Sequence, residues 1–362
     1  MRQRIINSVI AIFLLATLPV WGQTTVIRRS PSQTNSKTKP PTWFGTGSDF
    51  SEGLSCVMNY DCKFGFVNKN GTAVIPYKWK HAGSFSEGLA WVVDDNGKYG
   101  YIDKKGNTVI PCIWKSANPF SEGLAKVCDD NRKYGFIDKT GNMVISCSWK
   151  EAHDYSDGLS LVGDGKNYYF IDRTGSVVIT CQTHKVYSFS DGLAHIEDNH
   201  YRDGFIDKTG KEVIPCKFRY AKDFKEGLAC VLDSSGKRGF VNKEGAVVIP
   251  YKWKYAGTFS EGLARVVDDN GKYGYINKKG ELVIPCKWKY VYNFKEGLAG
   301  VYDENWKYGF IDKTGKVVIP VKWREMPNRT EIEWGFSDGL AWVIDDNNQK
   351  SHIINKQGQI VK

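Results

Sequence analysis

Carboxylates recur along this 362-residue chain at a nearly constant spacing. In every copy of the phrase Phe-Ser-Glu-Gly-Leu an acid precedes the glycine, from Glu52 to Asp338. Carboxylate oxygens are ligands of Ca²⁺, so calcium binding is the first chemistry to weigh. One acid per repeat of 35 residues supplies far fewer than the roughly six to eight oxygens that calcium takes. We therefore expect no metal site and no cofactor.

A second recurring pattern is a tryptophan followed by a basic residue. Such a row of aromatic and basic side chains could bind a glycan by ring stacking, or an acidic polymer by stacking and charge. The alternative is that the indoles pack in the core and the basic residues are their solvated neighbours. The pairs are Trp79 and Lys80, Trp114 and Lys115, Trp149 and Lys150, Trp253 and Lys254, Trp288 and Lys289, and Trp323 and Arg324.

Catalytic constellations are absent from the sequence. The six histidines share no common position in the repeat, and no serine-hydrolase elbow, His-Glu-x-x-His or P-loop motif occurs. An Asp or Asn does recur three residues before a glycine, as in Asp103 to Gly106. Asx and Gly in that order close a tight turn, so the turn alone explains the recurring acid. The sequence predicts no catalytic residue and no enzyme.

The spacing of the opening phrase predicts the domain organisation. Seven of its eight intervals are 34 or 35 residues, and only the last is longer, at 42. Self-similarity at such a period indicates a repeat array, which we expect over residues 42–362. The nine units begin at the aromatic residues Phe50, Phe85, Phe120, Tyr155, Phe189, Phe224, Phe259, Phe294 and Phe336.

Each unit contains three short runs of β-branched and aromatic residues. In the second unit these are 89–93, 99–103 and 108–114, and turn residues separate them. We expect an all-β tandem array of about nine three-stranded antiparallel units, with Gly100 and its equivalents at a bulge or a close backbone approach. Units of this length favour an open solenoid or superhelical array, because propeller blades are normally longer. The alternative is a closed β-propeller-like ring, since residues 41–44 and 360–362 would together complete one third strand.

The first 22 residues differ from the rest of the chain. Arg2 and Arg4 precede an apolar stretch from residue 5 to 20, and small residues follow. This order is typical of a secretory signal peptide, and the apolar stretch is short for a bilayer span. We expect residues 1–22 to be a signal peptide, residues 23–41 a flexible linker, and the mature chain to be exported without a membrane span. Export and the dispersed positive charge of +10 argue against a nucleic-acid partner.

Nine cysteines acquire meaning if the protein is exported. Five of them recur at one position of the repeat, and equivalent residues of neighbouring units lie too far apart to be bridged. These five are expected to be small buried apolar residues: Cys112, Cys147, Cys181, Cys216 and Cys286. Cys56 and Cys62 flank an expected hairpin, so they are the candidates for a disulfide.

The repeated segments resemble a known family. Lys-Tyr-Gly-Phe-Ile-Asp-Lys-Thr-Gly at residues 133–141, the recurring Val-Ile-Pro and the opening phrase are similar to the bacterial WG-repeat (KWG-repeat) family. The resemblance implies an exported or surface-associated protein and supplies no catalytic residues. We expect an exported non-enzymatic scaffold that contacts a protein or a cell-envelope component, or alternatively a carbohydrate-binding module that uses the recurring tryptophans.

Overall fold

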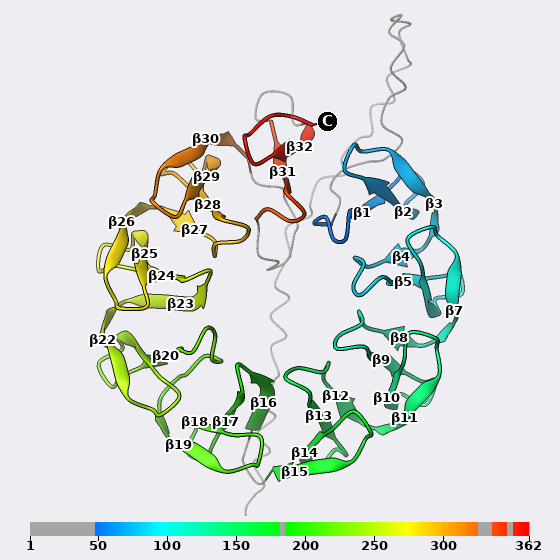
Figure 1. Cartoon of the computed structure of the whole chain (residues 1–362), viewed down its shortest axis with the longest axis horizontal. Coiled ribbons are helices and arrows are strands. Elements are labelled where there is room, and N and C mark those ends of the chain that lie inside the picture. The colour runs from blue at the N-terminus through cyan, green and yellow to red at the C-terminus, as the bar shows by residue number, and fades with distance from the viewer. Residues whose placement is uncertain (1–47, 182–184, 325–334, 346–349, 362) are drawn as a thin grey trace, which may run out of the picture. The chain divides into compact units, whose positions relative to one another are not determined.

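The computed structural model describes residues 48–181, 185–324, 335–345 and 350–361. The expected signal peptide 1–22 and linker 23–41 lie outside these residues. The described chain forms 32 strands that make nine small antiparallel sheets, which follow one another along the chain from β1 to β32 (Figure 1). No helix in this part of the chain has the length and hydropathy of a membrane span. We number the sheets first to ninth in chain order.

The second sheet shows the plan of a unit. Its order is β4 (His81–Ala82), β5 (Ala90–Val93), β6 (Tyr99–Ile102) and β7 (Thr108–Trp114), and all neighbours are antiparallel. Strands β5 to β7 are the three strands expected from the sequence. The short β4 comes from the tail of the preceding unit, whose Lys80 N–H donates to the Val93 carbonyl at 2.9 Å. Six of the nine sheets therefore have four strands where three were expected.

The remaining strands repeat this plan with small variations. Their bounds are β1 Leu54–Met58, β2 Phe64–Asn68, β3 Ala73–Trp79, β8 Ser116–Ala117, β9 Ala125–Cys128, β10 Tyr134–Ile137, β11 Met143–Trp149, β12 Glu151–Ala152, β13 Ser160–Gly163, β14 Tyr168–Ile171, β15 Val177–Cys181, β16 Lys185–Ser190, β17 Leu193–Glu197, β18 Asp203–Ile206, β19 Glu212–Phe218, β20 Ala229–Leu232, β21 Arg238–Val241, β22 Val247–Trp253, β23 Tyr255–Ser260, β24 Leu263–Val267, β25 Tyr273–Asn277, β26 Leu282–Trp288, β27 Tyr290–Val291, β28 Leu298–Tyr302, β29 Tyr308–Asp312, β30 Val317–Trp323, β31 Leu340–Ile344 and β32 Ser351–Asn355.

Local chemistry explains the turn and the bulge of each unit. The Asp103 carboxylate accepts the backbone N–H groups of Lys105 and Asn107 at 2.9 Å, and Gly106 has a φ of 84°, so the expected Asx turn is confirmed. The register of β6 and β7 shifts on either side of Tyr101. A Cβ on Gly100 would lie 2.6 Å from the Ile110 carbonyl oxygen, which confirms the expected close approach.

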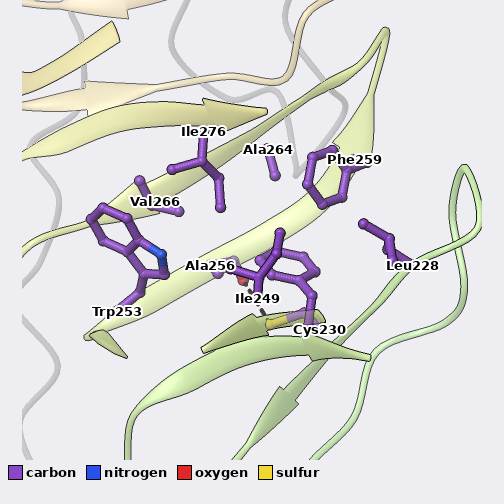
Figure 2. Close-up of a cluster of buried hydrophobic side chains, with 10 residues drawn as sticks. Leu228, Cys230, Ile249, Trp253, Ala256, Phe259, Ala264, Val266 and Ile276 are labelled. Atoms are coloured by element: carbon purple, nitrogen blue, oxygen red, sulfur yellow. Dashed lines mark hydrogen bonds between the residues drawn. The ribbon is translucent and has the colours of Figure 1, made fainter. Parts of the chain in front are cut away.

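The core lies between successive sheets rather than within one sheet. Figure 2 shows the cluster between the sixth and seventh sheets, where Cys230 and Ile249 of one sheet face Ala264, Val266 and Ile276 of the next. The Cys230 thiol lies 3.5 Å from the Ala256 carbonyl oxygen, the contact drawn as a dashed line. Each sheet thus buries one face on each neighbour, as expected of a repeat array.

Nine such clusters occur among the described residues, one more than nine sheets in an open row would need. The additional cluster joins Phe50 and Val57 of the first unit to Trp342 and Ile353 of the ninth. The rings of Phe50 and Trp342 stack with centroids 6.2 Å apart. The all-β tandem array is confirmed: small antiparallel sheets repeat along the chain, and none of them closes into a barrel, which is consistent with an open repeat array. Residues of the first and ninth units also contact each other.

Candidate binding surface

The recurring tryptophans belong to the core. Four of the six are buried, with exposed fractions of 5–8%: Trp79, Trp253, Trp288 and Trp323. Trp114 and Trp149 are half-buried. In each buried case the lysine that precedes the tryptophan lies over its ring, for example the Lys78 ammonium 4.6 Å from the Trp79 centroid. These rings have no free face for a sugar to stack on.

The basic residues that follow these tryptophans lie at the surface. All six are exposed, namely Lys80, Lys115, Lys150, Lys254, Lys289 and Arg324. The structure therefore separates the two halves of the expected stripe, with the indoles inside and the charges in solvent. This arrangement corresponds to core packing rather than to a ligand-binding row.

Cys56 and Cys62, the pair proposed for a disulfide, both have free thiols in this structure. Cys56 lies on β1, where its thiol contacts the Ala82 carbonyl oxygen at 3.5 Å in the interior. Cys62 lies in the exposed turn that follows β1, with a φ of 57°. The side chains thus lie in different environments, and burial raises the pKa of the Cys56 thiol to about 12.

The acid of the opening phrase connects each unit to the next. Ser86 and Leu89 exchange backbone hydrogen bonds, and Glu87 and Gly88 between them have φ values of 54° and 90°, which is a tight hairpin turn. This conformation is unfavourable for glutamate. The Glu87 carboxylate accepts the Gly123 N–H of the following unit at 3.0 Å, and this bond holds the turn in place.

The same hydrogen bond occurs at all nine junctions, and we call this set the latch. The acceptors and donors are Glu52 and Gly88, Glu87 and Gly123, Glu122 and Gly158, Asp157 and Gly192, Asp191 and Gly227, Glu226 and Gly262, Glu261 and Gly297, Glu296 and Gly339, and Asp338 and Gly53. The last pair joins the ninth unit to the first.

Most latch acids also bind a cation from the same following unit that donates the glycine N–H. Lys139 contacts Glu87 at 3.0 Å, and Lys104 contacts Glu52 at 2.8 Å. Burial raises the pKa of Glu87, but the hydrogen bonds from Lys139 and Gly123 outweigh it, so the pKa is lowered. The latch acids are therefore taken up by structural contacts, and the described chain contains no cluster of three residues able to hold a metal ion.

Four other positions change from unit to unit, and their side chains contact one another. In the four-stranded sheets three of them lie on or beside the first two strands, and the fourth begins the third strand. In the three-stranded sixth sheet the fourth position begins β21. From the second to the eighth sheet they are His81, Gly83, Trp91 and Tyr99; Ser116, Asn118, Lys126 and Tyr134; Glu151, His153, Leu161 and Tyr168; Lys185, Tyr187, His195 and Asp203; Tyr220, Lys222, Cys230 and Arg238; Tyr255, Gly257, Arg265 and Tyr273; and Tyr290, Tyr292, Gly300 and Tyr308.

In the third and fourth sheets these positions are neutral or internally paired. Lys126 donates to the Ala152 carbonyl at 2.9 Å and lies 3.8 Å from the Asp154 carboxylate. The Tyr168 hydroxyl donates to Glu151 at 2.7 Å. Each charge here therefore has a partner nearby.

In the sixth to eighth sheets the same positions form a chain of alternating rings and cations, which we call the ladder. The Arg238 guanidinium lies 4.9 Å from the Tyr220 ring centroid and 4.6 Å from that of Tyr255. Arg265 lies 5.8 Å from Tyr255 and 5.9 Å from Tyr290. The ladder consists of Tyr220, Lys222, Arg238, Tyr255, Arg265 and Tyr290.

The three ladder cations have no carboxylate partner among the described residues. Lys222 donates to the Tyr255 hydroxyl at 3.0 Å, Arg238 to the Ala256 carbonyl at 3.4 Å, and Arg265 to the Val291 carbonyl at 3.1 Å. Burial raises the pKa of Tyr255, but Lys222 and the guanidinium charges outweigh it, so the pKa lies below its ordinary value. The ladder is therefore a half-buried region of uncompensated positive charge.

A cavity of about 280 Å³ opens at one end of the ladder, beside Tyr220 and Lys222. Tyr187 and His195 form part of its wall, with their rings stacked 4.6 Å apart. His195 is 7% exposed, and its Nε2 lies 3.0 Å from the buried Asp203 carboxylate. Asp203 also accepts the Ala221 N–H at 2.5 Å, so this pair supports the wall rather than standing free as a catalytic dyad.

The sequence does contain information about this surface. We expected binding residues to recur in every unit, but the ladder residues are ones that do not recur. Residues that recur in every unit are required for the turns, the latch and the core. Three of the four ladder positions differ from unit to unit, and no recurring motif marks them. At the fourth position Arg238 replaces the tyrosine that five of the seven sheets hold. Aligning the units and comparing charge at each variable position would have identified Lys222, Arg238 and Arg265 as a basic group.

Comparison with solved structures finds likenesses at low sequence identity. The computationally designed Ika8 protein is 11% identical, with a TM-score of 0.43, and the match covers 77% of this chain and 96% of that one. BamB from Moraxella catarrhalis is 12% identical, with a TM-score of 0.38 and coverage of 77% and 94%. The extracellular domain of a hybrid two-component system of B. thetaiotaomicron, BT3049, is 12% identical, with a TM-score of 0.26 and coverage of 91% and 60%. No curated protein matches the sequence.

The family comparison is more specific. The WG containing repeat matches eight consecutive segments, 64–99, 99–132, 134–168, 170–199, 204–233, 239–273, 273–305 and 308–348. These segments include the Asx turn at Asp103, the close approach at Gly100 and the latch bond from Glu87 to Gly123. The chain belongs to the family of proteins built from the WG containing repeat.

Proposed function

We propose that this protein is an exported, non-enzymatic repeat scaffold that holds a protein or cell-envelope partner against its variable positions. The observation that supports this most is that recurring and variable positions of each unit make different contacts. Recurring acids and glycines make the latch, whereas the variable positions form a separate set of contacts that includes the ladder. Repeat proteins commonly bind partners through such variable positions on a constant frame.

The carbohydrate-binding alternative rested on the recurring tryptophans. Since four of the six indoles are buried and covered by lysines, that row supports glycan binding poorly. The variable positions, with tyrosines and cations at the surface, support recognition of a macromolecular partner better.

Site-specific crosslinking in the producing cell tests the scaffold function. A photoreactive amino acid would replace Tyr220 of the ladder in one tagged full-length chain, and the exposed Lys279 of a turn in a control chain. We expect one discrete crosslinked partner from position 220 and none from position 279. Equal crosslinking from both positions, or from neither, would count against a defined binding surface.

The N-terminus of the purified mature chain tests export. Mass spectrometry is expected to find a chain that begins near Gln23, because we predict cleavage after Gly22. A chain that retains its first 22 residues would contradict the expected signal peptide.

A further inference from the structure

We infer that the ladder binds an acidic segment of a partner protein, whose Asp and Glu side chains pair with Lys222, Arg238 and Arg265. The inference rests on the proposed scaffold function and names the chemistry of its partner. Half-buried cations without a carboxylate partner are unfavourable, because no ion pair offsets the free energy of desolvating them. A partner that supplies the missing anions removes that cost on binding.

A matched position within the same chain supports this reading. Lys126 in the third unit and Arg265 in the seventh occupy the same position, and both donate to the carbonyl of the residue 26 positions later. Lys126 has Asp154 beside it, whereas the corresponding residue beside Arg265 is Asn293. The fold can therefore place a carboxylate at this point, and in the ladder the sequence does not.

Ring geometry favours a peptide over a sugar or a nucleic acid. Both of the latter would use free aromatic faces for stacking. The Tyr255 ring has the Arg238 and Arg265 guanidinium groups 4.6 and 5.8 Å from its centroid, so cations already take up its surroundings. A ligand can therefore use the hydrogen-bond donors and the positive charge of the ladder cations, which the ladder tyrosines border. Tyr and Arg together are the residue types that dominate protein–protein binding energy.

Two acids near the ladder limit where the segment can lie. Asp203 is buried against His195 and accepts the Ala221 N–H, so its carboxylate is not accessible to a ligand. Asp223 is exposed and lines the cavity beside Lys222, together with Lys225. The acidic segment should therefore follow the ladder from Lys222 toward Tyr290, away from Asp223.

Binding of a fluorescent polyglutamate peptide to the full-length protein, followed by anisotropy, tests the inference. The test variant combines Lys222→Asn, Arg238→Tyr and Arg265→Leu, which are residues that the same positions hold in other units as Asn118, Tyr134 and Leu161. The control combines Lys208→Gln, Lys279→Gln and Lys316→Gln on exposed turns, and removes the same charge. We expect the test variant to weaken binding by roughly tenfold or more and the control by less than about twofold.

A second variant keeps the test decisive if the triple variant unfolds. Asn293→Asp leaves every ladder residue in place and adds the carboxylate found in the third unit. It should weaken polyglutamate binding several-fold, by competing for Arg265. Equal affinity of wild type, triple variant and Asn293→Asp would overturn the inference.

Competing probes distinguish the class of partner from the function itself. Polygalacturonate, an oligonucleotide or phosphatidylglycerol vesicles that bind in a ladder-dependent way while polyglutamate does not would overturn an acidic peptide as the partner. If the ladder substitutions leave the affinity for polyglutamate unchanged but the crosslinked partner is still captured at position 220, this inference fails and the scaffold function stands. If polyglutamate depends on the ladder and no partner is captured, the scaffold function fails instead.

Discussion

The latch and the ladder both link successive units through charged side chains, but they differ in whether each cation has a carboxylate partner. In the latch, cations such as Lys139 contact carboxylates that also accept a glycine N–H. In the ladder, the described contacts of Arg238 and Arg265 are rings, hydroxyls, carbonyls and the Cys230 thiol, and none is a carboxylate. Cations paired with carboxylates in the latch stabilise the fold, whereas the ladder cations, which lack a carboxylate, are available to a negatively charged ligand.

Breaking the latch should give the largest effect on stability. The double variant Glu87→Ala and Glu122→Ala removes the acceptors for Gly123 and Gly158. We expect a loss of about 2 kcal/mol in the free energy of unfolding, roughly 1 kcal/mol for each partly exposed charged hydrogen bond. Urea denaturation measures it. Glu244→Ala, an exposed acid outside the latch, is the control and should change stability by less than about 0.5 kcal/mol.

Acid should weaken the latch. The latch acids Glu52, Glu87, Glu261 and Glu296 have pKa values lowered by their partners, although burial alone would raise them. Their stabilisation is present above the unfolded-state pKa of about 4.3, and is lost as pH falls through the folded-state values. Thermal melts from neutral pH downward should show the melting temperature falling below about pH 4.5. A melting temperature that stays constant through that range would contradict the role of the latch.

Removing a ladder cation should behave differently from removing a latch acid. Arg265→Leu deletes a half-buried charge that has no carboxylate partner, so the free energy of unfolding should change by less than about 1 kcal/mol or rise slightly. Urea denaturation again provides the value. A loss as large as that of the latch variant would mean that the ladder is a structural feature and not a binding surface.

The smallest effect on stability is expected from adding a carboxylate partner to one ladder cation. Asn293→Asp should stabilise the fold by roughly 0.5 kcal/mol, because it pairs Arg265 as Asp154 pairs Lys126. The gain should disappear when Arg265→Leu is added, and this double-mutant cycle isolates the new pair. No coupling between the two changes would indicate that the charges do not meet.

Sequence reasoning predicted the features that depend on local chemistry. The Asx turn at Asp103, the close approach at Gly100 and the strands around them follow from residue types a few positions apart. It did not predict the fourth strand, because Lys80 finds its partner Val93 in the next unit. The contact of Phe50 with Trp342 likewise depends on how the rotation between units accumulates, which no single unit encodes.

The candidate site followed the opposite pattern. The tryptophan row was chosen because it recurs, yet a recurring large apolar residue is what the inter-sheet core needs, as Trp253 shows (Figure 2). Arg238 and Arg265 do not recur, and each gains meaning only from the tyrosines that the preceding and following segments place beside it. Such spacing between units is a property of the folded chain.

The ionisation of Tyr255 tests the central claim most directly, because this hydroxyl accepts from Lys222 and lies among the ladder cations. Its pKa can be followed by NMR of chain carrying ¹³C-labelled tyrosine, with Tyr255→Phe to assign the signal. We predict a pKa below the ordinary value of about 10 in the free protein, and a rise on saturation with polyglutamate, because the added carboxylates offset the positive charge. A pKa that is not lowered in the free protein, or that polyglutamate leaves unchanged, would contradict an anion-binding ladder.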